Sequence, residues 1–172
     1  FQRIRQSLKL DDEMDEAQIR KAAGLIRNIF RYMDKDAKDI MTHRKNIVAI
    51  DATETLENAF QFMLGESYSR FPIYEEDIDQ IIGFIHVKDL LQGCLSGQLS
   101  LKKINREILT VPEVMPAPAL LQLMKNRRIY LAVVVDEYGG TAGIITLEDI
   151  LEELVGEIWD EHDDVVEDVR QQ

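Results

Sequence analysis

The fold is decided by the stretch IYLAVVVDEYGGTAGIITLEDILEELVG, residues 129–156. Residues 131–135 are all apolar and mostly β-branched, which is typical of a strand buried on both faces. The glycine-containing segment 136–140 predicts a tight turn, and residues 142–145 predict a second short strand. From Thr146 onward, apolar residues recur at helical spacing. The predicted unit is therefore strand, turn, strand, helix.

The same unit occurs earlier in the chain, at an offset of 60 residues and without gaps. Residues 71–74 align with residues 131–134, and Asp89 aligns with Asp149. The match extends backwards through a helix-like apolar pattern and a strand-like lead-in in each copy. The two copies fill roughly residues 40–156. Because the repeat is too long for a solenoid unit and occurs twice, it predicts a pseudo-twofold pair of small α/β modules.

We expect four regions along the chain. They are a helical lead-in at residues 1–39, a first module at 40–97, a second module at 98–158, and an acidic linker or tail at 159–172. Within the lead-in, apolar residues recur at helical spacing between Met14 and Met33, which predicts a helix of about four turns. The strand-like lead-ins of the two modules are predicted at residues 47–50 and 108–111.

The composition is that of a globular protein with a real core, since 45% of the 172 residues are hydrophobic and 30% are charged. The formal net charge of −12 argues against nucleic acid or an anionic membrane surface as the main partner, because both are bound by clustered lysine and arginine. Most of the negative charge lies between Glu148 and the end of the chain. The acidic run at 159–172 is interpreted as a linker, with a cation-binding strip as the alternative, because clustered carboxylates bind hard cations.

The cellular setting is suggested by what the sequence lacks. The single cysteine, Cys94, excludes an internal disulfide and is compatible with a reduced, intracellular setting. No stretch approaches the ~18 to 20 apolar residues of a membrane helix, and no signal peptide is recognisable. Because the chain begins with Phe1, we interpret it as a piece of a longer protein. The expected location is the cytoplasm, which includes the cytosolic face of a membrane protein.

Four short motifs carry a resemblance to a known family. They are Asp-Ile-Met-Thr at 39–42, Ser-Arg-Phe-Pro at 69–72, Val-Lys-Asp-Leu-Leu at 87–91 and Asp-Glu-Tyr-Gly-Gly at 136–140. Together they resemble the cystathionine-β-synthase (CBS) domain pair of the CorC/HlyC family of magnesium and cobalt efflux and hemolysin-related proteins, whose animal relatives are the cyclin M transporters. The resemblance covers about residues 38–160. It implies an α/β (α+β) fold, a tandem CBS pair with pseudo-twofold symmetry, preceded by a helical lead-in.

Thr146 and Asp149 have the spacing of a helix capping box, a structural role that by itself explains both residues. The same geometry suits a nucleotide. Free N–H groups at a helix N-terminus, a hydroxyl and a carboxylate can together hold phosphate oxygens and a ribose diol. Since a carboxylate repels phosphates, Asp149 is expected to face the ribose. The resemblance to CBS pairs favours the binding role, which can coexist with capping.

The resemblance implies further contacts with an adenine nucleotide. In CBS pairs, the segment entering the first module's opening strand lies beside the loop that leaves the second module's last strand, and a nucleotide binds there. Thr42 matches a hydroxyl near the ribose or phosphates, and Val48 and Ile73 are expected to lie against the base. Arg70 has two interpretations. Its guanidinium suits a phosphate, or it forms a surface ion pair with an acid of the segment 75–77.

The first module departs from this pattern at His86, which stands where the second module has Thr146. Because the hydroxyl is missing there, we expect one occupied nucleotide site per chain and none beside Asp89. His86 is expected to be packed or hydrogen-bonded. Together with His43 and His162 it shows no spacing typical of a zinc site, so no metal site is expected.

The expected function is regulatory. We expect a module that binds AMP or ATP, with Mg²⁺ accompanying the nucleotide, and that regulates magnesium or cobalt efflux through a membrane transport domain or membrane-associated partner. Two CBS pairs are expected to form a homodimer. The alternative is a dimerisation scaffold that has lost its ligand. An enzyme acting on the nucleotide is disfavoured, because the sequence offers no defensible Ser-His-Asp or Cys-His set and no Walker-type phosphate loop.

Overall fold

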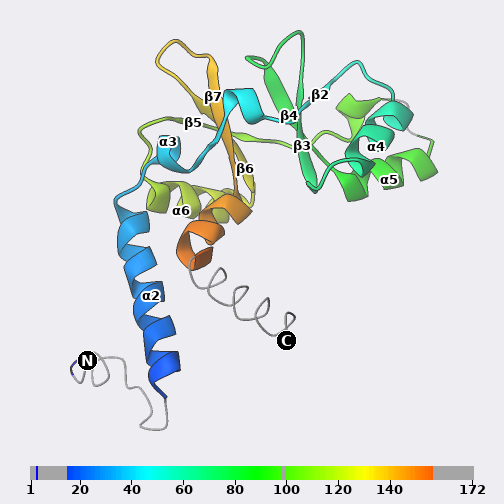
Figure 1. The fold of residues 1–172 in the computed structure, drawn as a ribbon. Helices are drawn as coiled ribbons and strands as arrows, with labels where there is room; N and C mark the ends of the chain where they lie inside the picture. The colour runs from blue at the N-terminus through cyan, green and yellow to red at the C-terminus, as the bar shows by residue number, and fades with distance from the viewer. Residues whose placement is uncertain (1–2, 4–14, 98–99, 157–172) are drawn as a thin grey trace. The chain divides into compact units, whose positions relative to one another are not determined.

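Figure 1 shows the computed structural model of the chain. The structure describes residues 3, 15–97 and 100–156, and the acidic segment predicted at 159–172 lies outside them. The chain divides into two compact units, of which one is Lys35–Ile150 and the other combines Phe1–Asp34 with Leu151–Gln172. All the predicted site residues belong to the unit Lys35–Ile150.

The unit that combines the two ends of the chain contains α2 (Glu16–Met33), which confirms the predicted helix. Asp15 sets its start. The Asp15 side chain accepts a hydrogen bond from the N–H of Gln18 (2.8 Å), and the Gln18 side chain accepts one from the N–H of Asp15 (3.2 Å). In the same unit, the buried Asn28 amide donates to the carbonyl of Leu154 (3.1 Å), which satisfies a polar group that would otherwise be costly to bury.

Within the described residues, the second module is built on a four-stranded sheet in the order β1-β7-β6-β5. Its strands are β1 (Thr42–His43), β5 (Leu109–Pro112), β6 (Leu131–Val135) and β7 (Thr141–Thr146). The parallel strands β5 and β6 are joined by α6 (Ala117–Arg127), whereas β6 and β7 form an antiparallel hairpin. A helix follows β7 at residues 147–156. The predicted strand, turn, strand, helix unit is therefore confirmed.

The first module repeats this arrangement on a sheet that, in the part of the chain described, has three strands in the order β2-β3-β4 (Figure 1). Its elements are β2 (Ile50–Asp51), α4 (Leu56–Leu64), β3 (Arg70–Tyr74), β4 (Ile81–His86) and α5 (Val87–Leu95). As in the second module, the first two strands are parallel and the last two antiparallel. Phe71, Ile73, Ile85 and Leu90 are fully buried in one core. The predicted pair of α/β modules is confirmed.

The segment that leads into the first module pairs with the second module instead. It forms α3 (Ala37–Ile40), β1 and the 3₁₀ turn η1 (Arg44–Asn46), and β1 lies antiparallel to β7. The strand predicted at 47–50 is therefore wrong except at Ile50. Residues 47–49 are apolar, but they connect the sheet of β1 to the sheet of β2 and have no neighbouring strand. The other predicted lead-in, 108–111, is confirmed by β5, which follows the 3₁₀ turn η2 (Leu101–Lys103).

An ionic contact joins the two modules at Asp79, in the turn between β3 and β4. Its carboxylate accepts hydrogen bonds from the Arg44 guanidinium and from the N–H of Thr141 in β7 (2.9 Å). Arg44 also donates to the carbonyl of Thr141 (3.2 Å). The guanidinium first, and then the N–H of Thr141, hold the pKa of Asp79 below its ordinary value. Asp79 is therefore ionised across the physiological pH range and links the first module to Thr141, the first residue of β7.

Protonation of Asp79 is expected to weaken this contact. A carboxyl whose pKa is lowered in the folded state contributes stability above its ordinary pKa of 3.8, and loses it as the pH falls through the folded-state value. The melting temperature of Asp79→Asn should lie slightly below that of the unmodified chain at about pH 6, and the difference should vanish once the pH has fallen below the folded-state pKa of Asp79. In an Arg44→Gln background the difference at about pH 6 should shrink. A difference that stays constant over this range would contradict the role assigned to Asp79.

Candidate functional site

One cavity gathers residues from both modules, and we call it the Thr146 cavity. Its volume is about 80 Å³. It is lined by Thr42, Asn46, Ile47, Val48, Tyr68, Arg70, Pro72, Ile144, Thr146 and Asp149. These residues come from β1, η1 and the connection after it, β3 with its lead-in, β7 and the start of the following helix. The structure therefore brings together every residue predicted for the nucleotide site except Ile73.

Thr146 and Asp149 form the predicted capping box. The Asp149 carboxylate accepts a hydrogen bond through Oδ2 from the N–H of Thr146 (2.8 Å), and the Thr146 hydroxyl oxygen accepts one from the N–H of Asp149 (3.3 Å). These bonds fix the first turn of the helix and satisfy two of its backbone groups. The N–H of Leu147 donates to the carbonyl of Tyr130 (3.0 Å), and the N–H of Glu148 donates to its own carboxylate. What the turn offers at the cavity is therefore the positive end of the helix dipole, which favours a negatively charged group.

Arg70 is the first residue of β3 and donates to the carboxylate of Glu148, with 2.5 Å between Nη1 and Oε1. The alternative of a pair within residues 75–77 is wrong, because that segment follows the opposite end of β3. Glu75 pairs with Lys102 instead (2.6 Å). The Arg70 side chain is 22% exposed and that of Glu148 is 61% exposed, so the pair lies at the edge of the cavity.

Glu148 is a site residue that the sequence interpretation missed. Burial raises its pKa, but hydrogen bonds from its own backbone N–H and from Arg70 outweigh this effect, so that its pKa lies below the ordinary value. Its carboxylate is therefore ionised at neutral pH, close to Thr146. The sequence signal for Glu148 was its position in the first helical turn, between Thr146 and Asp149. The helix dipole stabilises an acid there, and the same position is next to any ligand bound at the helix N-terminus.

The apolar wall of the cavity includes Pro72 in place of the predicted Ile73. Ile73 is fully buried in the core of the first module and pairs with Ile50 of β2, so its side chain lies on the other face of β3. Pro72 is tolerated in this central strand because β2 begins to pair with β3 only at Ile73, so no strand needs the N–H that proline lacks. Val48 and Ile144 also line the cavity.

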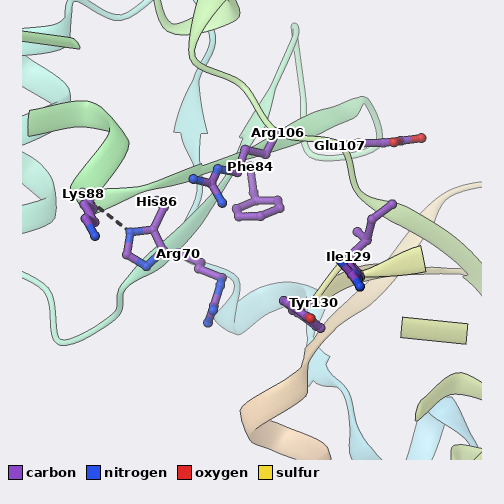
Figure 2. Close-up of a pocket in the computed structure, with 9 residues that line it drawn as sticks. Arg70, Phe84, His86, Lys88, Arg106, Glu107, Ile129 and Tyr130 are labelled. Carbon is purple, nitrogen blue, oxygen red and sulfur yellow. Dashed lines mark hydrogen bonds between the residues drawn. The ribbon is translucent and has the colours of Figure 1, made fainter. Parts of the chain in front are cut away.

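A second cleft, which we call the Arg106 cleft, lies at the equivalent place of the repeat and has a volume of about 480 Å³ (Figure 2). It is lined by Arg70, Phe84, His86, Lys88, Arg106, Glu107, Arg128, Ile129 and Tyr130. His86 accepts a hydrogen bond at Nδ1 from the N–H of Lys88 (3.0 Å), so it caps α5 as Thr146 caps its own helix. The expectation that His86 is hydrogen-bonded is confirmed. Burial first, and then the charge of Arg70, lower the pKa of His86, which keeps the imidazole neutral at pH 7.

Three further observations concern metal binding, membrane spanning and the cysteine in the described residues. Among them, no group of three or more His, Cys, Asp or Glu side chains is placed to hold a metal ion. None of the helices in this part of the chain is long and apolar enough to cross a membrane. Cys94 is an exposed free thiol.

Comparison with known sequences identifies both modules. The family model described as "CBS domain" matches residues 37–96 and 101–156. The UPF0053 protein YugS of Bacillus subtilis (strain 168) is 42% identical over 139 residues, covering 80% of this chain and 32% of YugS. Hemolysin C of Rickettsia prowazekii (strain Madrid E) is 39% identical over 142 residues, covering 81% of this chain and 47% of that protein. The chain thus spans about a third to a half of the length of these relatives.

Comparison with solved structures agrees. The CBS domain of the bacterial CNNM/CorC family Mg²⁺ transporter, solved in complex with ATP, is 38% identical with a TM-score of 0.73, and the match covers 79% of this chain and 98% of that one. A CBS-domain pair from Klebsiella pneumoniae, solved with bound AMP, is 28% identical with a TM-score of 0.61, and covers 71% and 99% respectively. The chain therefore belongs to the CBS domain family, as a tandem pair of the kind found in CNNM/CorC and hemolysin C relatives.

Proposed function

We propose that this CBS pair is a regulatory module that binds an adenine nucleotide, AMP or ATP, in the Thr146 cavity. One observation carries the proposal. Thr42, Arg70 and Asp149 lie far apart in the sequence and come from both modules, yet they line one cavity together with Thr146. A family relative solved in complex with ATP and a CBS pair solved with bound AMP support it.

Each side chain has a distinct role in this binding mode. The dipole of the helix after Thr146 attracts the phosphates, the Thr146 hydroxyl donates to a phosphate oxygen, and Arg70 adds a charge-assisted hydrogen bond. Asp149 uses Oδ2 for the helix cap, which leaves Oδ1 for the ribose hydroxyls. Thr42 contacts the ribose or a phosphate from the opposite wall. Val48 and Pro72 offer the apolar surface on which the adenine ring packs.

Nucleotide binding requires this cavity to open. Its volume is about 80 Å³, whereas pockets for small organic ligands typically measure roughly 300–1,000 Å³. Arg70 lines the cavity and is held by Glu148, so release of that ion pair is part of the opening. A nucleotide that binds the open arrangement more tightly shifts the population toward it. The same event therefore couples ligand binding to a change in the arrangement of the two modules.

Mg²⁺ accompanies a triphosphate in this proposal. Glu148 and Asp149 place two carboxylates beside the phosphate-binding turn, and an unscreened triphosphate would be repelled by them. AMP carries fewer charges and should depend less on the cation. Equal ATP affinity with and without Mg²⁺ would remove the cation from the mechanism.

We further propose that the module belongs to a larger protein whose membrane transport domain, or membrane-associated partner, exports magnesium or cobalt from the cytoplasm. The relatives are two to three times longer than the matched region, and one similar structure comes from an Mg²⁺ transporter. In this setting, nucleotide binding would open the Thr146 cavity, and the resulting change in the arrangement of the two modules would regulate the transport domain according to the nucleotide concentration.

Thr146→Ala and Asp149→Asn are each expected to weaken AMP and ATP binding at least about tenfold, because Thr146→Ala removes a hydroxyl that donates to a phosphate and Asp149→Asn removes a charged acceptor for the ribose hydroxyls. Asp149→Asn keeps an oxygen that can accept from the N–H of Thr146, so the helix cap is retained. The measurement is isothermal titration of the chain with AMP, ADP and ATP, with and without Mg²⁺, and the unmodified chain should bind about one nucleotide.

The matched control is Thr55→Ala, which removes the hydroxyl that caps α4 through the N–H of Asn58 (3.1 Å), outside the Thr146 cavity. It should lower the free energy of unfolding by about 1 kcal/mol and leave nucleotide binding unchanged. No saturable heat from any of the three nucleotides would contradict the proposal, and the Thr146 and Asp149 pattern would then be only a helix cap.

The exposed apolar surface of α4 and α5 favours a second function, dimerisation. Phe62, Leu64, Leu91 and Leu95 are between 44% and 81% exposed. Such a surface on two helices of one module is typical of a protein contact, and a homodimer of CBS pairs would cover it. Dimerisation is compatible with nucleotide binding. A stable dimer that shows no response to AMP or ATP would reduce the function to that of a scaffold.

A further inference from the structure

The Arg106 cleft is cationic, although the chain as a whole has a net charge of −12. Arg70, Lys88, Arg106 and Arg128 line it, and they come from β3, α5, the segment before β5 and the end of α6. Among the described lining residues, Glu107 is the one acid. Figure 2 shows Glu107 extending away from the other charged side chains that it labels. Positive charge is therefore concentrated on one small volume.

Much of this charge is not neutralised. Within the described residues, Lys88 and Arg128 form no ion pair. Arg106 is paired with Asp89, with 2.8 Å between Nη2 and Oδ1 and 2.5 Å between Nε and Oδ2. Glu107 lies 3.5 Å from Arg127, outside the cleft lining, and is partly neutralised there. Two complete positive charges and the exposed guanidinium of Arg106 remain to attract an anion.

The repeat shows that this charge is specific to one cavity. Equivalent positions, 60 residues apart, differ between the Thr146 cavity and the Arg106 cleft. The replacements are Tyr68 by Arg128, Asn46 by Arg106, Thr146 by His86 and Glu148 by Lys88. The hydroxyl is lost, and Asp89 is held by Arg106, so neither group is available for a ribose. Compared with the Thr146 cavity, the Arg106 cleft therefore lacks groups suited to a nucleoside and has groups suited to an anion.

Arg128 adds an independent observation. It ends α6 in the left-handed conformation, with φ 53° and ψ 38°, where glycine is the usual residue because a Cβ is unfavourable there. Position 128 therefore carries a long cationic side chain although glycine would give the folded state a lower backbone energy there. Backbone strain of this kind concentrates at sites where a particular side chain is needed.

We propose that the Arg106 cleft binds a compact polyphosphate anion, such as inorganic pyrophosphate or tripolyphosphate, without a nucleoside. Its volume of about 480 Å³ accommodates a triphosphate chain in the cavity as it stands. The guanidiniums of Arg106 and Arg128 offer planar pairs of donors to phosphate oxygens, and Lys88 supplies a point charge. The cleft shares Arg70 with the Thr146 cavity, but Lys88, Arg106 and Arg128 line the cleft and not that cavity, so polyphosphate binding does not require a bound nucleotide.

The test is isothermal titration of the whole chain with sodium tripolyphosphate in Mg²⁺-free buffer, using a Thr146→Ala/Asp149→Asn background to disable the Thr146 cavity. Saturable binding near one site per chain is expected in that background, and ATP should bind no more tightly than tripolyphosphate. Adding Lys88→Gln and Arg128→Gly should weaken the binding at least about tenfold. Because glycine suits the backbone at 128, Arg128→Gly alone should raise the melting temperature while it weakens binding, which separates loss of the ligand from loss of the fold.

The charge-matched control is Lys103→Gln/Lys125→Gln, which removes two exposed cations outside the cleft. It should leave tripolyphosphate binding unchanged. Equal weakening by this control pair would show diffuse attraction and overturn the proposal. A blank titration in the disabled background, or ATP binding more tightly than tripolyphosphate there, would also overturn it, whereas nucleotide binding in the Thr146 cavity is decided separately by AMP titration of the chain with Thr146 and Asp149 intact.

Discussion

Gly143→Ala is expected to destabilise the second module by about 3 kcal/mol and to abolish nucleotide binding in the same step. A Cβ at position 143 would lie 2.4 Å from the carbonyl oxygen of Thr42 and 2.7 Å from Sδ of Met41. The methionine can rotate, but the carbonyl belongs to β1, which pairs with β7 through Thr42 and His43. Relief of the clash must therefore displace β1. Because Thr42 lines the Thr146 cavity, its displacement removes one wall of the proposed nucleotide site.

Urea unfolding and nucleotide titration measure the two effects. The control is Gly65→Ala at the end of α4, where the nearest atom to a Cβ is the carbonyl oxygen of Phe62 at 3.5 Å. This substitution should change the free energy of unfolding by less than about 0.5 kcal/mol and leave binding intact. If Gly143→Ala bound AMP as tightly as the unmodified chain, the position of Thr42 in β1 could not matter for the ligand.

The fold could be predicted largely because the repeat is ungapped. Aligning the chain with itself identifies both hairpins and the helices beside them, since apolar periodicity within a module reflects local packing. The exchange of β1 into the sheet of the second module could not be predicted in this way. It depends on Gly143 admitting the backbone of Thr42, a contact between residues about a hundred positions apart. Hydrophobic pattern instead favoured a strand at 47–50, because pattern does not reveal whether a neighbouring strand is present.

The capping box of Thr146 and Asp149 was predictable, because it depends only on their own segment. The partner of Arg70 was not predictable, because Glu148 lies 78 positions later and reaches it only in the folded chain. Ile73 was wrongly placed on the cavity wall because alternation along β3 was not resolved to the correct face. A proline in mid-strand, Pro72, was the clue that this edge of β3 is open.

Arg70→Gln is expected to weaken ATP binding about a hundredfold, which corresponds to ~2.7 kcal/mol, a typical value for a lost hydrogen bond to a charged group. The Arg70 side chain is 22% exposed, so its attraction for phosphate is only partly screened by solvent. Its removal also leaves Glu148 ionised and unpaired beside the phosphates.

Glu148→Gln should act in the opposite direction, strengthening ATP binding about tenfold and reducing its dependence on Mg²⁺, because one repulsive charge is gone and Arg70 is free. Glu57→Gln, an exposed acid on α4 outside the cavity lining, should change neither property.

The double variant Arg70→Gln/Glu148→Gln separates two ways in which Glu148 can act. If Glu148 opposes ATP only by holding Arg70, then its removal has no effect once Arg70 is absent, and the double variant binds like Arg70→Gln. If Glu148 repels the phosphates directly, the double variant binds more tightly than Arg70→Gln, and Mg²⁺ restores part of the difference. The coupling measured by this cycle is meaningful because the two side chains are in contact. Unchanged ATP affinity in all three variants would mean that the phosphates do not reach the edge of the cavity where this ion pair lies.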